Sequence, residues 1–116
     1  MAEDETDRWA PFRPLVGEWE GVGSGLPGKG VEEMDCEFVL QDKFLRIRNH
    51  SVYEPQAKNP EGEVHDDWAF ISYDEIRNAF VLREFFVEGY VNQSVLDDIS
   101  EDGNTLTFLT ESIENL

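Results

Sequence analysis

Apolar and polar residues alternate with a period of two along much of the chain, which is the pattern of half-buried β-strands. The clearest example runs from Val31 to Leu40, where Met34, Cys36 and Phe38 alternate with acidic residues. Successive side chains of a strand point to opposite faces of its sheet. The pattern therefore predicts one face, Leu40 included, turned to an apolar interior and one carboxylate face turned to water.

The segment from Leu15 to Gly23 is predicted to be the first strand, and Trp19 is its large aromatic side chain. Trp19 shares its face with glycines, whereas Glu18 and Glu20 lie on the opposite face and favour water. Glycines within strands allow neighbouring strands to approach and bend closely. We therefore expect Trp19 to point inward, either as a core residue at one closed end or as a ligand contact.

Further segments continue this pattern toward the C-terminus, and polar or glycine-containing turns separate them. With the first two strands they give about seven. The fold class predicted is all-β, an antiparallel up-and-down meander that forms a β-barrel or a partly open barrel. The further predicted strands are a strand containing Leu45 to Ser51, then Val64 to Tyr73, Asn78 to Glu88, Tyr90 to Ile99 and Thr105 to Ile113.

The residues before the first strand are predicted to form an acidic tail and a short helical plug. Pro11 suits the first turn of a helix, and Trp9 and Phe12 supply the apolar contacts. Residues 1–14 are therefore assigned to the tail and plug, and residues 15–116 to one domain. Barrels that hold a ligand commonly use about eight strands or more. The sheet is therefore expected to stay open, to be completed by a second chain, or to continue beyond Leu116.

The hairpin after the second strand allows its two strands to be registered against each other. If Asp42 and Lys43 form a two-residue turn, opposite charges pair on the outer face. A shift by one residue would bury Arg46 and Arg48 without partners, so we expect both, with His50, to face solvent. The pairs expected are Leu40 with Leu45, Phe38 with Ile47, Cys36 with Asn49, Met34 with Ser51, Glu37 with Arg48 and Asp35 with His50.

The next two strands carry the remaining large aromatic residues. We expect Trp68 and Phe70 to face the interior, which places His65 and Asp67 on the outside. The strand from 78 to 88 is apolar on both faces, so its outer side is expected to be covered as well. Because neighbours alternate, one member of the adjacent charged pair at 83 and 84 faces inward, where a buried charge needs a partner or a ligand.

Net charge limits the partners that the chain can have. The 116 residues include 26 acidic and 9 basic residues, which gives a net charge of −17. This excess repels nucleic acid and anionic membrane surfaces. No apolar run approaches the ~18 residues of a membrane span, and the first residues are acidic, unlike a signal peptide. We therefore expect no membrane insertion and a cytoplasmic location.

Cys36 is the single cysteine, so no disulfide can form within the chain. It lies between Asp35 and Glu37, and neighbouring carboxylates raise the pKa of a thiol. The sequence therefore predicts a buried, unreactive thiol and gives no sign of an oxidising compartment.

Short motifs resemble one group of barrels. Residues 17–23, GEWEGVG, resemble the opening Gly-x-Trp-x-Gly-x-Gly of the nitrobindins, a haem-binding family of the lipocalin-like (calycin) superfamily that also includes fatty-acid-binding proteins. Residues 63–67, EVHDD, are similar to the mid-chain His-containing strand of nitrobindins. Residues 71–74 and the Asp102–Gly103 turn look closer to bacterial lipocalin-like proteins of unknown function. The resemblance implies a lipocalin-like barrel that holds a small apolar ligand.

The same resemblance implies haem as an alternative cofactor and nitrogen oxides as alternative substrates. Nitrobindins ligate haem iron through a His near the C-terminus, and no His follows His65 in this sequence. The resemblance therefore leaves His65 as the candidate haem ligand.

Three function classes agree with these observations. The first is non-catalytic binding or carriage of a small apolar molecule, with no cofactor or metal ion. The second is catalysis, either haem-linked or through acid–base chemistry by His65 with Asp67, or by Glu84. The third is self-association, as a homodimer, through an open sheet edge. The residues expected to contact a ligand are Trp19, Met34, Phe38, Ile47, Asn49, Trp68, Phe70, Arg83 and Phe85.

Overall fold

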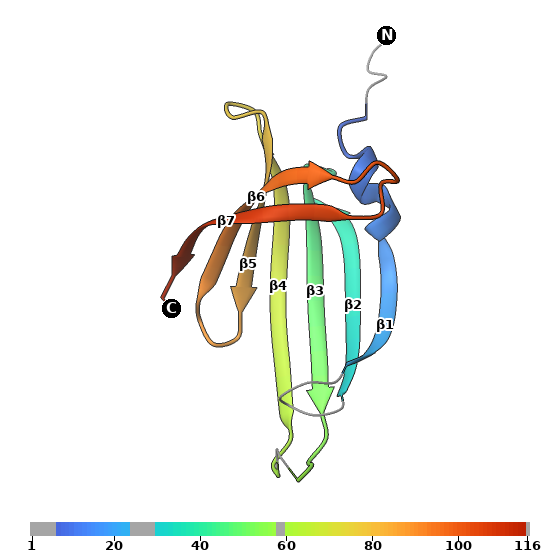
Figure 1. Ribbon diagram of the computed structural model, residues 1–116, viewed down its shortest axis with the longest axis vertical. Helices are drawn as coiled ribbons and strands as arrows, with labels where there is room; N and C mark the ends of the chain where they lie inside the picture. Colours follow the sequence, from blue (N-terminus) through green and yellow to red (C-terminus); the bar gives the residue numbers. More distant parts are fainter. Residues whose placement is uncertain (1–6, 24–29, 58–59, 116) are drawn as a thin grey trace.

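The computed structural model describes residues 7–23, 30–57 and 60–115, and within them the chain is one seven-stranded antiparallel sheet (Figure 1). Each strand pairs with the strand that follows it, so the sheet has the order of the sequence. The predicted all-β meander is confirmed. The elements are η1 (Ala10–Leu15), β1 (Gly17–Gly23), β2 (Gly30–Val39), β3 (Phe44–Tyr53), β4 (Glu63–Asp74), β5 (Ala79–Phe86), β6 (Val91–Ile99) and β7 (Leu106–Glu114).

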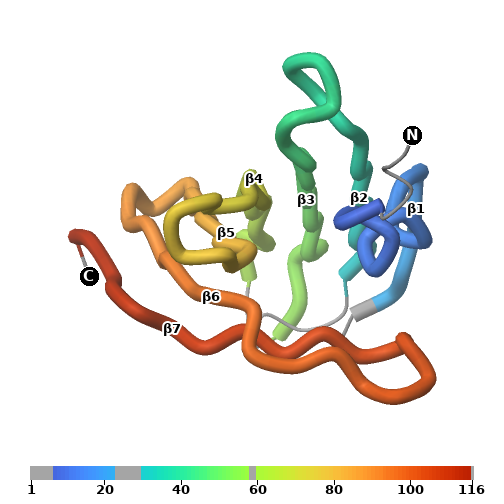
Figure 2. The backbone as a smooth tube through the Cα atoms, turned by 90° about the horizontal axis from the view of Figure 1, so that it is seen from above, coloured from blue at the N-terminus to red at the C-terminus, as the bar shows by residue number. Residues whose placement is uncertain are grey.

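The sheet curls around the 3-10 helix η1 but does not close. Figure 2 shows β6 and β7 turning back beneath the sheet, with η1 enclosed between them and β1 to β3. β1 is paired with β2 and β7 with β6, so each of these two strands keeps one unpaired edge within the described residues. The expectation of an open sheet is therefore confirmed, and self-association through its edges stays a prediction.

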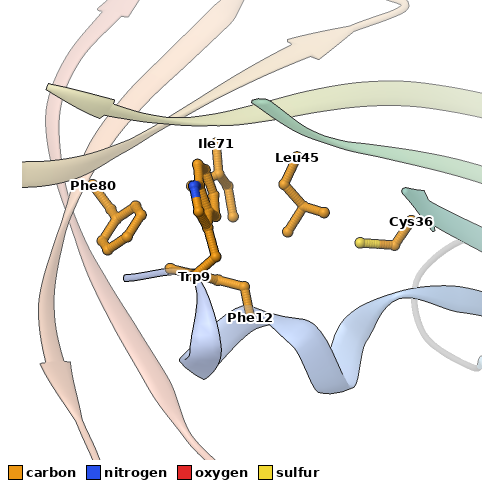
Figure 3. Close-up of a cluster of buried hydrophobic side chains, with 6 residues drawn as sticks. All are labelled: Trp9, Phe12, Cys36, Leu45, Ile71 and Phe80. Carbon is orange, nitrogen blue, oxygen red and sulfur yellow. The ribbon is translucent and has the colours of Figure 1, made fainter. Parts of the chain in front are cut away.

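The core lies where η1 meets the concave face (Figure 3). The Phe12 ring lies 4.7 Å from the Phe80 ring, and the Trp9 ring lies 5.0 Å from Phe80 and 5.3 Å from Phe38. These edge-to-face contacts fill the concave face with aromatic side chains. The expected plug, with Trp9 and Phe12 as its apolar contacts, is confirmed. The buried core residues are Trp9, Phe12, Cys36, Leu45, Ile71 and Phe80.

Local polar contacts fold the plug. The Asp7 carboxylate accepts hydrogen bonds from the Trp9 backbone N–H at 3.1 Å and from the Arg13 guanidinium at 2.5 Å. This guanidinium holds the pKa of Asp7 below its ordinary value. Pro11 lies in the first turn, where its missing N–H leaves no helical hydrogen bond unmade. The short range of these contacts explains why the plug can be predicted from sequence.

The β2–β3 hairpin has a different register from the predicted one. Phe38 pairs with Leu45, a shift of two residues, because the chain turns through four residues, from Leu40 to Lys43. Leu40, Gln41 and Asp42 take positive φ angles of 53°, 59° and 62°. Leu40 therefore lies exposed in the turn, and its expected inward position is wrong.

A shift of two residues keeps every other side chain of this hairpin on its predicted face. Cys36 pairs with Ile47 and Met34 with Asn49 on the inner face. On the outer face the expected charge pairing moves to new partners, so that Arg48 lies opposite Asp35 rather than Glu37. Burial raises the pKa of Cys36 to about 11, which agrees with the predicted unreactive thiol.

The faces of β4 are the reverse of the prediction. Ala69 and Ile71 pair with the inward-facing residues of β3 and are buried, so Trp68 and Phe70 lie on the outer face. The space beneath η1 is already filled by the rings of Trp9 and Phe12, which leaves room for small and aliphatic side chains. His65 and Asp67, expected outside, consequently lie on the inner face.

β5 follows the register of β4. Ala69 pairs with Glu84, so Glu84 faces inward, whereas Arg83 and Phe85 lie on the outer face. The expectation that Arg83 or Glu84 would face inward is met by Glu84. On this outer side Val81 is buried whereas Phe85 is 36% exposed, so within the described residues the expected cover is present at only one end of β5.

Replacing Phe12 tests the importance of the plug. Phe12→Ala is expected to lower the free energy of unfolding by about 3–5 kcal/mol, because it empties a fully buried site. Urea denaturation followed by circular dichroism measures the change. Ile76→Ala, at a site that is 94% exposed, serves as the control and should change it by less than about 0.5 kcal/mol. An equally small change in Phe12→Ala would contradict a core built on η1.

Candidate functional site

One row of side chains crosses the inner face beyond the plug. Register pairs Trp19 with Met34, Met34 with Asn49, Asn49 with Asp67, and Asp67 with Phe86. Paired residues of antiparallel strands lie side by side on the same face. We call Trp19, Met34, Asn49, Asp67 and Phe86 the inner row. Trp19 is 48% exposed, so its expected role as a core residue at a closed end is wrong.

Glycines of β1 leave space around Trp19. Gly17 and Gly21 flank it on the same face, and nothing lies within 4 Å of the position that a Cβ of Gly21 would take. The Trp19 indole N–H donates to the Leu15 carbonyl oxygen at 2.8 Å, which fixes the ring beside Met34. The indole therefore presents a held, half-exposed aromatic surface.

Polar groups occupy the middle of the inner row. The Asn49 amide donates to the Asp67 carboxylate at 2.8 Å. The other oxygen of Asp67 lies 3.9 Å from Nδ1 of His65, and Nε2 of His65 lies 2.8 Å from the Glu88 carboxylate. The side chain of Asp67 is 17% exposed and that of His65 is 25% exposed. These contacts form a linked polar cluster between two apolar ends.

The strand positions of the inner face contain carboxylates but no Lys or Arg, and the only described guanidinium groups on inner-face rings are those of Arg8, over Tyr73, and Arg13, over Phe38, at the end near the plug. In the register of the described strands, the inner positions hold Glu32, Glu63, Asp67 and Glu84, and none holds Lys or Arg. Glu84 accepts a hydrogen bond from the Asn92 amide at 3.0 Å. All strand arginines point to the outer face. The inner face therefore repels anions and accepts uncharged or cationic groups.

The cluster brings together His65 and Asp67, the pair considered for acid–base chemistry. His65 lies between two carboxylates, and Ser51, its partner across β3 and β4, makes no hydrogen bond with it. A nucleophile aligned with a base is the usual sign of covalent catalysis. Within the described residues, no group of three or more His, Cys, Asp or Glu side chains is placed to hold a metal ion.

The outer face gathers the other predicted contacts. Trp68 lies between two arginines, whose guanidinium carbons are 5.8 Å (Arg46) and 5.6 Å (Arg48) from the ring centre. The Phe70 and Phe85 rings meet at 6.2 Å. Together with Val87, these aromatic residues line a shallow hollow of about 410 Å³. Trp68, Phe70, Arg83 and Phe85 thus belong to a surface separate from the inner row.

The residues that the sequence predicted to contact a ligand are therefore divided between two surfaces. Of the residues expected to contact a ligand, Trp19, Met34 and Asn49 lie in the inner row, and Met34 also packs against the buried core, as Phe38 and Ile47 do. The prediction missed the inward positions of Asp67, His65 and Phe86, and it left Glu84 as one of two candidates for an inward charge. The signal that could have indicated these positions is the alternation of Ala69 and Ile71. Their side chains are small enough to pack into the part of the core that Trp9 and Phe12 already fill.

Comparison with protein-family models, curated proteins and solved structures finds no match for this chain. None of the helices in the described ranges has both the length and the apolar character needed to cross a membrane.

The Asp35–Arg48 pair gives a pH-dependent test of the outer face. Hydrogen bonding to Arg48, at 2.7 Å, holds the Asp35 pKa below its ordinary value of 3.8. The pair therefore stabilises the fold above pH 3.8, and this contribution is lost as the pH falls through the folded pKa. A carbon-detected NMR titration should place the Asp35 midpoint below 3.8. Arg48→Gln should move the midpoint upward, and an unchanged midpoint would contradict the pairing.

Proposed function

We propose that this protein is a non-catalytic binding module that takes a small, largely apolar molecule without an anionic group on the inner row. The observation that carries the proposal is the composition of that row. Trp19 and Met34 lie at one end, Phe86 lies at the other, and the hydrogen-bonded Asn49 and Asp67 lie between them. Mostly apolar linings with a few placed polar groups are typical of ligand sites.

The plug limits where such a ligand lies. The half of the concave face beneath η1 is packed with Trp9, Phe12 and Phe80, so the ligand site is restricted to the half beyond them. An open site buries less of a ligand than an enclosed pocket, and each Å² of apolar surface buried contributes about 25 cal/mol. We therefore expect micromolar or weaker affinity rather than the tight binding of a closed barrel.

The charge of the inner face narrows the ligand class. A fatty acid would bring its carboxylate to a surface that holds Asp67 and Glu84 and no basic strand residue. Haem would bring two propionates to the same surface, and the His65 Nε2 that would bind its iron is held by Glu88. These residues do not fit haem.

The tryptophans allow a matched test of the site. N-phenyl-1-naphthylamine, an uncharged apolar probe, should bind saturably and accept energy from Trp19. Trp19→Ala should weaken its binding by about tenfold, which corresponds to about 1.4 kcal/mol. Trp68→Ala is the control, since Trp68 is exposed to a similar extent, 45%, on the opposite face. Its binding should be unchanged, and oleate should not compete with the probe.

Three results of this experiment would contradict the proposal. These are the absence of saturable probe binding, a loss of binding in Trp68→Ala as large as that in Trp19→Ala, and displacement of the probe by oleate. Far-UV circular dichroism of both variants checks that each retains the sheet, and Trp19→Phe, which keeps an aromatic ring, should restore most of the binding.

A further inference from the structure

Four valines form a row across the outer face of β1 to β4, at the end of the sheet farthest from the plug. Register pairs Val22 with Val31, Val31 with Val52, and Val52 with Val64. Their exposed fractions lie between 38% and 86%, and Val22, on the unpaired edge strand β1, is the most exposed. We call these residues the valine row.

The valine row lies on a single layer of sheet. Figure 1 shows that this end of β2, β3 and β4 extends beyond β5, β6 and β7. The adjacent row of paired residues, which faces inward, consists of Gly21, Glu32, Ser51 and His65. No apolar core therefore lies behind the valines in the described residues. Domains are stabilised by packing two layers of secondary structure together. The valine row is therefore apolar surface without a covering layer in the described residues.

Carboxylates without partners lie beside the valine row. Glu20 is directly opposite Glu33 on the same face, and Glu18 is two residues before Glu20. None of the three makes a hydrogen bond or ion pair with another described residue, and like charges placed directly opposite each other destabilise a sheet. Glu18, Glu20 and Glu33 also border a hollow of about 560 Å³ on this face, which Trp68, Arg48 and His50 line as well. Arg48 and His50 are already bound by Asp35 and Asp66.

The two unpaired edges of the sheet differ in whether their carboxylates have partners. On β7, Glu111 is bound by Arg77 and Gln93, and Glu114 is bound by Arg83. On β1, Glu18 and Glu20 form no ion pair with any residue that the structure describes. The β1 edge therefore combines free backbone groups, an exposed valine and unpaired carboxylates, whereas the carboxylates of β7 are already neutralised.

We propose that the β1 edge binds an extended, basic polypeptide segment as an added strand. An aliphatic side chain of that segment would extend the valine row beside Val22, and its Lys or Arg side chains would lie against Glu20 and Glu18. Main-chain hydrogen bonds to the free edge provide affinity, and alternate side chains provide selectivity. The glycines at 17 and 21 leave room for inward side chains of the added strand, and the inward side chain between these two positions would lie beside Trp19.

Charge selects this partner over a second copy of the chain. A second copy carries the same excess of 26 acidic over 9 basic residues, and its β1 would bring Glu18 and Glu20 against their own counterparts. A basic segment instead gains from the net charge of −17, which steers it toward the surface and gives its binding a strong dependence on salt. This inference is independent of the ligand proposed for the inner row.

The probe for this proposal is the synthetic peptide acetyl-TVVKVKT-amide, titrated by NMR against the labelled full chain. Its Val and Lys positions match Val22, Glu20 and Glu18 in an antiparallel added strand. Saturable binding should shift the amide signals of β1 and slow their hydrogen exchange, and added salt should weaken it. The charge-reversed peptide acetyl-TVVEVET-amide should not bind.

Two double variants that remove the same number of charges distinguish specific binding at the β1 edge from general electrostatic attraction. Glu18→Gln with Glu20→Gln should weaken binding of the basic peptide by about tenfold or more. The matched control is Asp97→Asn with Glu101→Gln, since both residues are exposed and distant from β1 in the sheet order. The control should stay within about twofold of the parent chain.

Several results would overturn the proposal. The first is no binding at a peptide concentration of about 1 mM, which is the weak limit of specific affinities. The others are equal binding of the charge-reversed peptide, equal effects of the two double variants, and NMR shifts centred on β7. Dimerisation of the free chain in sedimentation equilibrium, blocked by the peptide, would assign the edge to a second copy and would also overturn it. None of these results bears on probe binding at Trp19.

Discussion

The packing of η1 against the concave face is the contact on which the rest of the structure depends. The sheet has unpaired edges at β1 and β7, so closure of a barrel does not hold it in its curled form. Trp9 and Phe12 give β2, β3, β4 and β5 a common partner, and Leu106 and Phe108 of β7 pack against the same cluster. The aromatic plug therefore determines both where the sheet curls and where its interior is filled.

A consequence of this packing is that the two ends of the sheet differ. Near η1 the inner face is a conventional core, centred on Leu45 and Ile71. At the other end the same strands continue as a single layer, and half-exposed side chains lie on both faces, Trp19 inside and Val31 outside. The strands are longer than is needed to form one core, and the candidate binding surfaces lie on the parts of the strands beyond that core. Basic strand residues are sorted between the faces, because the strand arginines are all outside, whereas the inner strand positions beyond the plug hold carboxylates and no Lys or Arg.

Period-two alternation was sufficient to predict the strands, their meander and the plug, because each of these depends on local sequence. The faces of β2 and β3 were predictable as well, since the carboxylates of β2 mark one face clearly. The faces of β4 were not predictable, because Trp68 and Phe70 on one face are as apolar as Ala69 and Ile71 on the other. The choice depends on the volume that η1 leaves free, which is a tertiary property. The inner positions of His65 and Asp67 follow from that choice.

Native-state hydrogen exchange tests the central claim most directly, because it reports the stability of each part of a strand separately. The account predicts that the amides of Cys36, Leu45 and Ile71 exchange only through global unfolding. Amides at the other ends of the same strands, around Val31 and Val52, should exchange through local opening at much lower free energy. Uniform protection along the full length of β2, β3 and β4 would contradict a fold held together by the plug at one end.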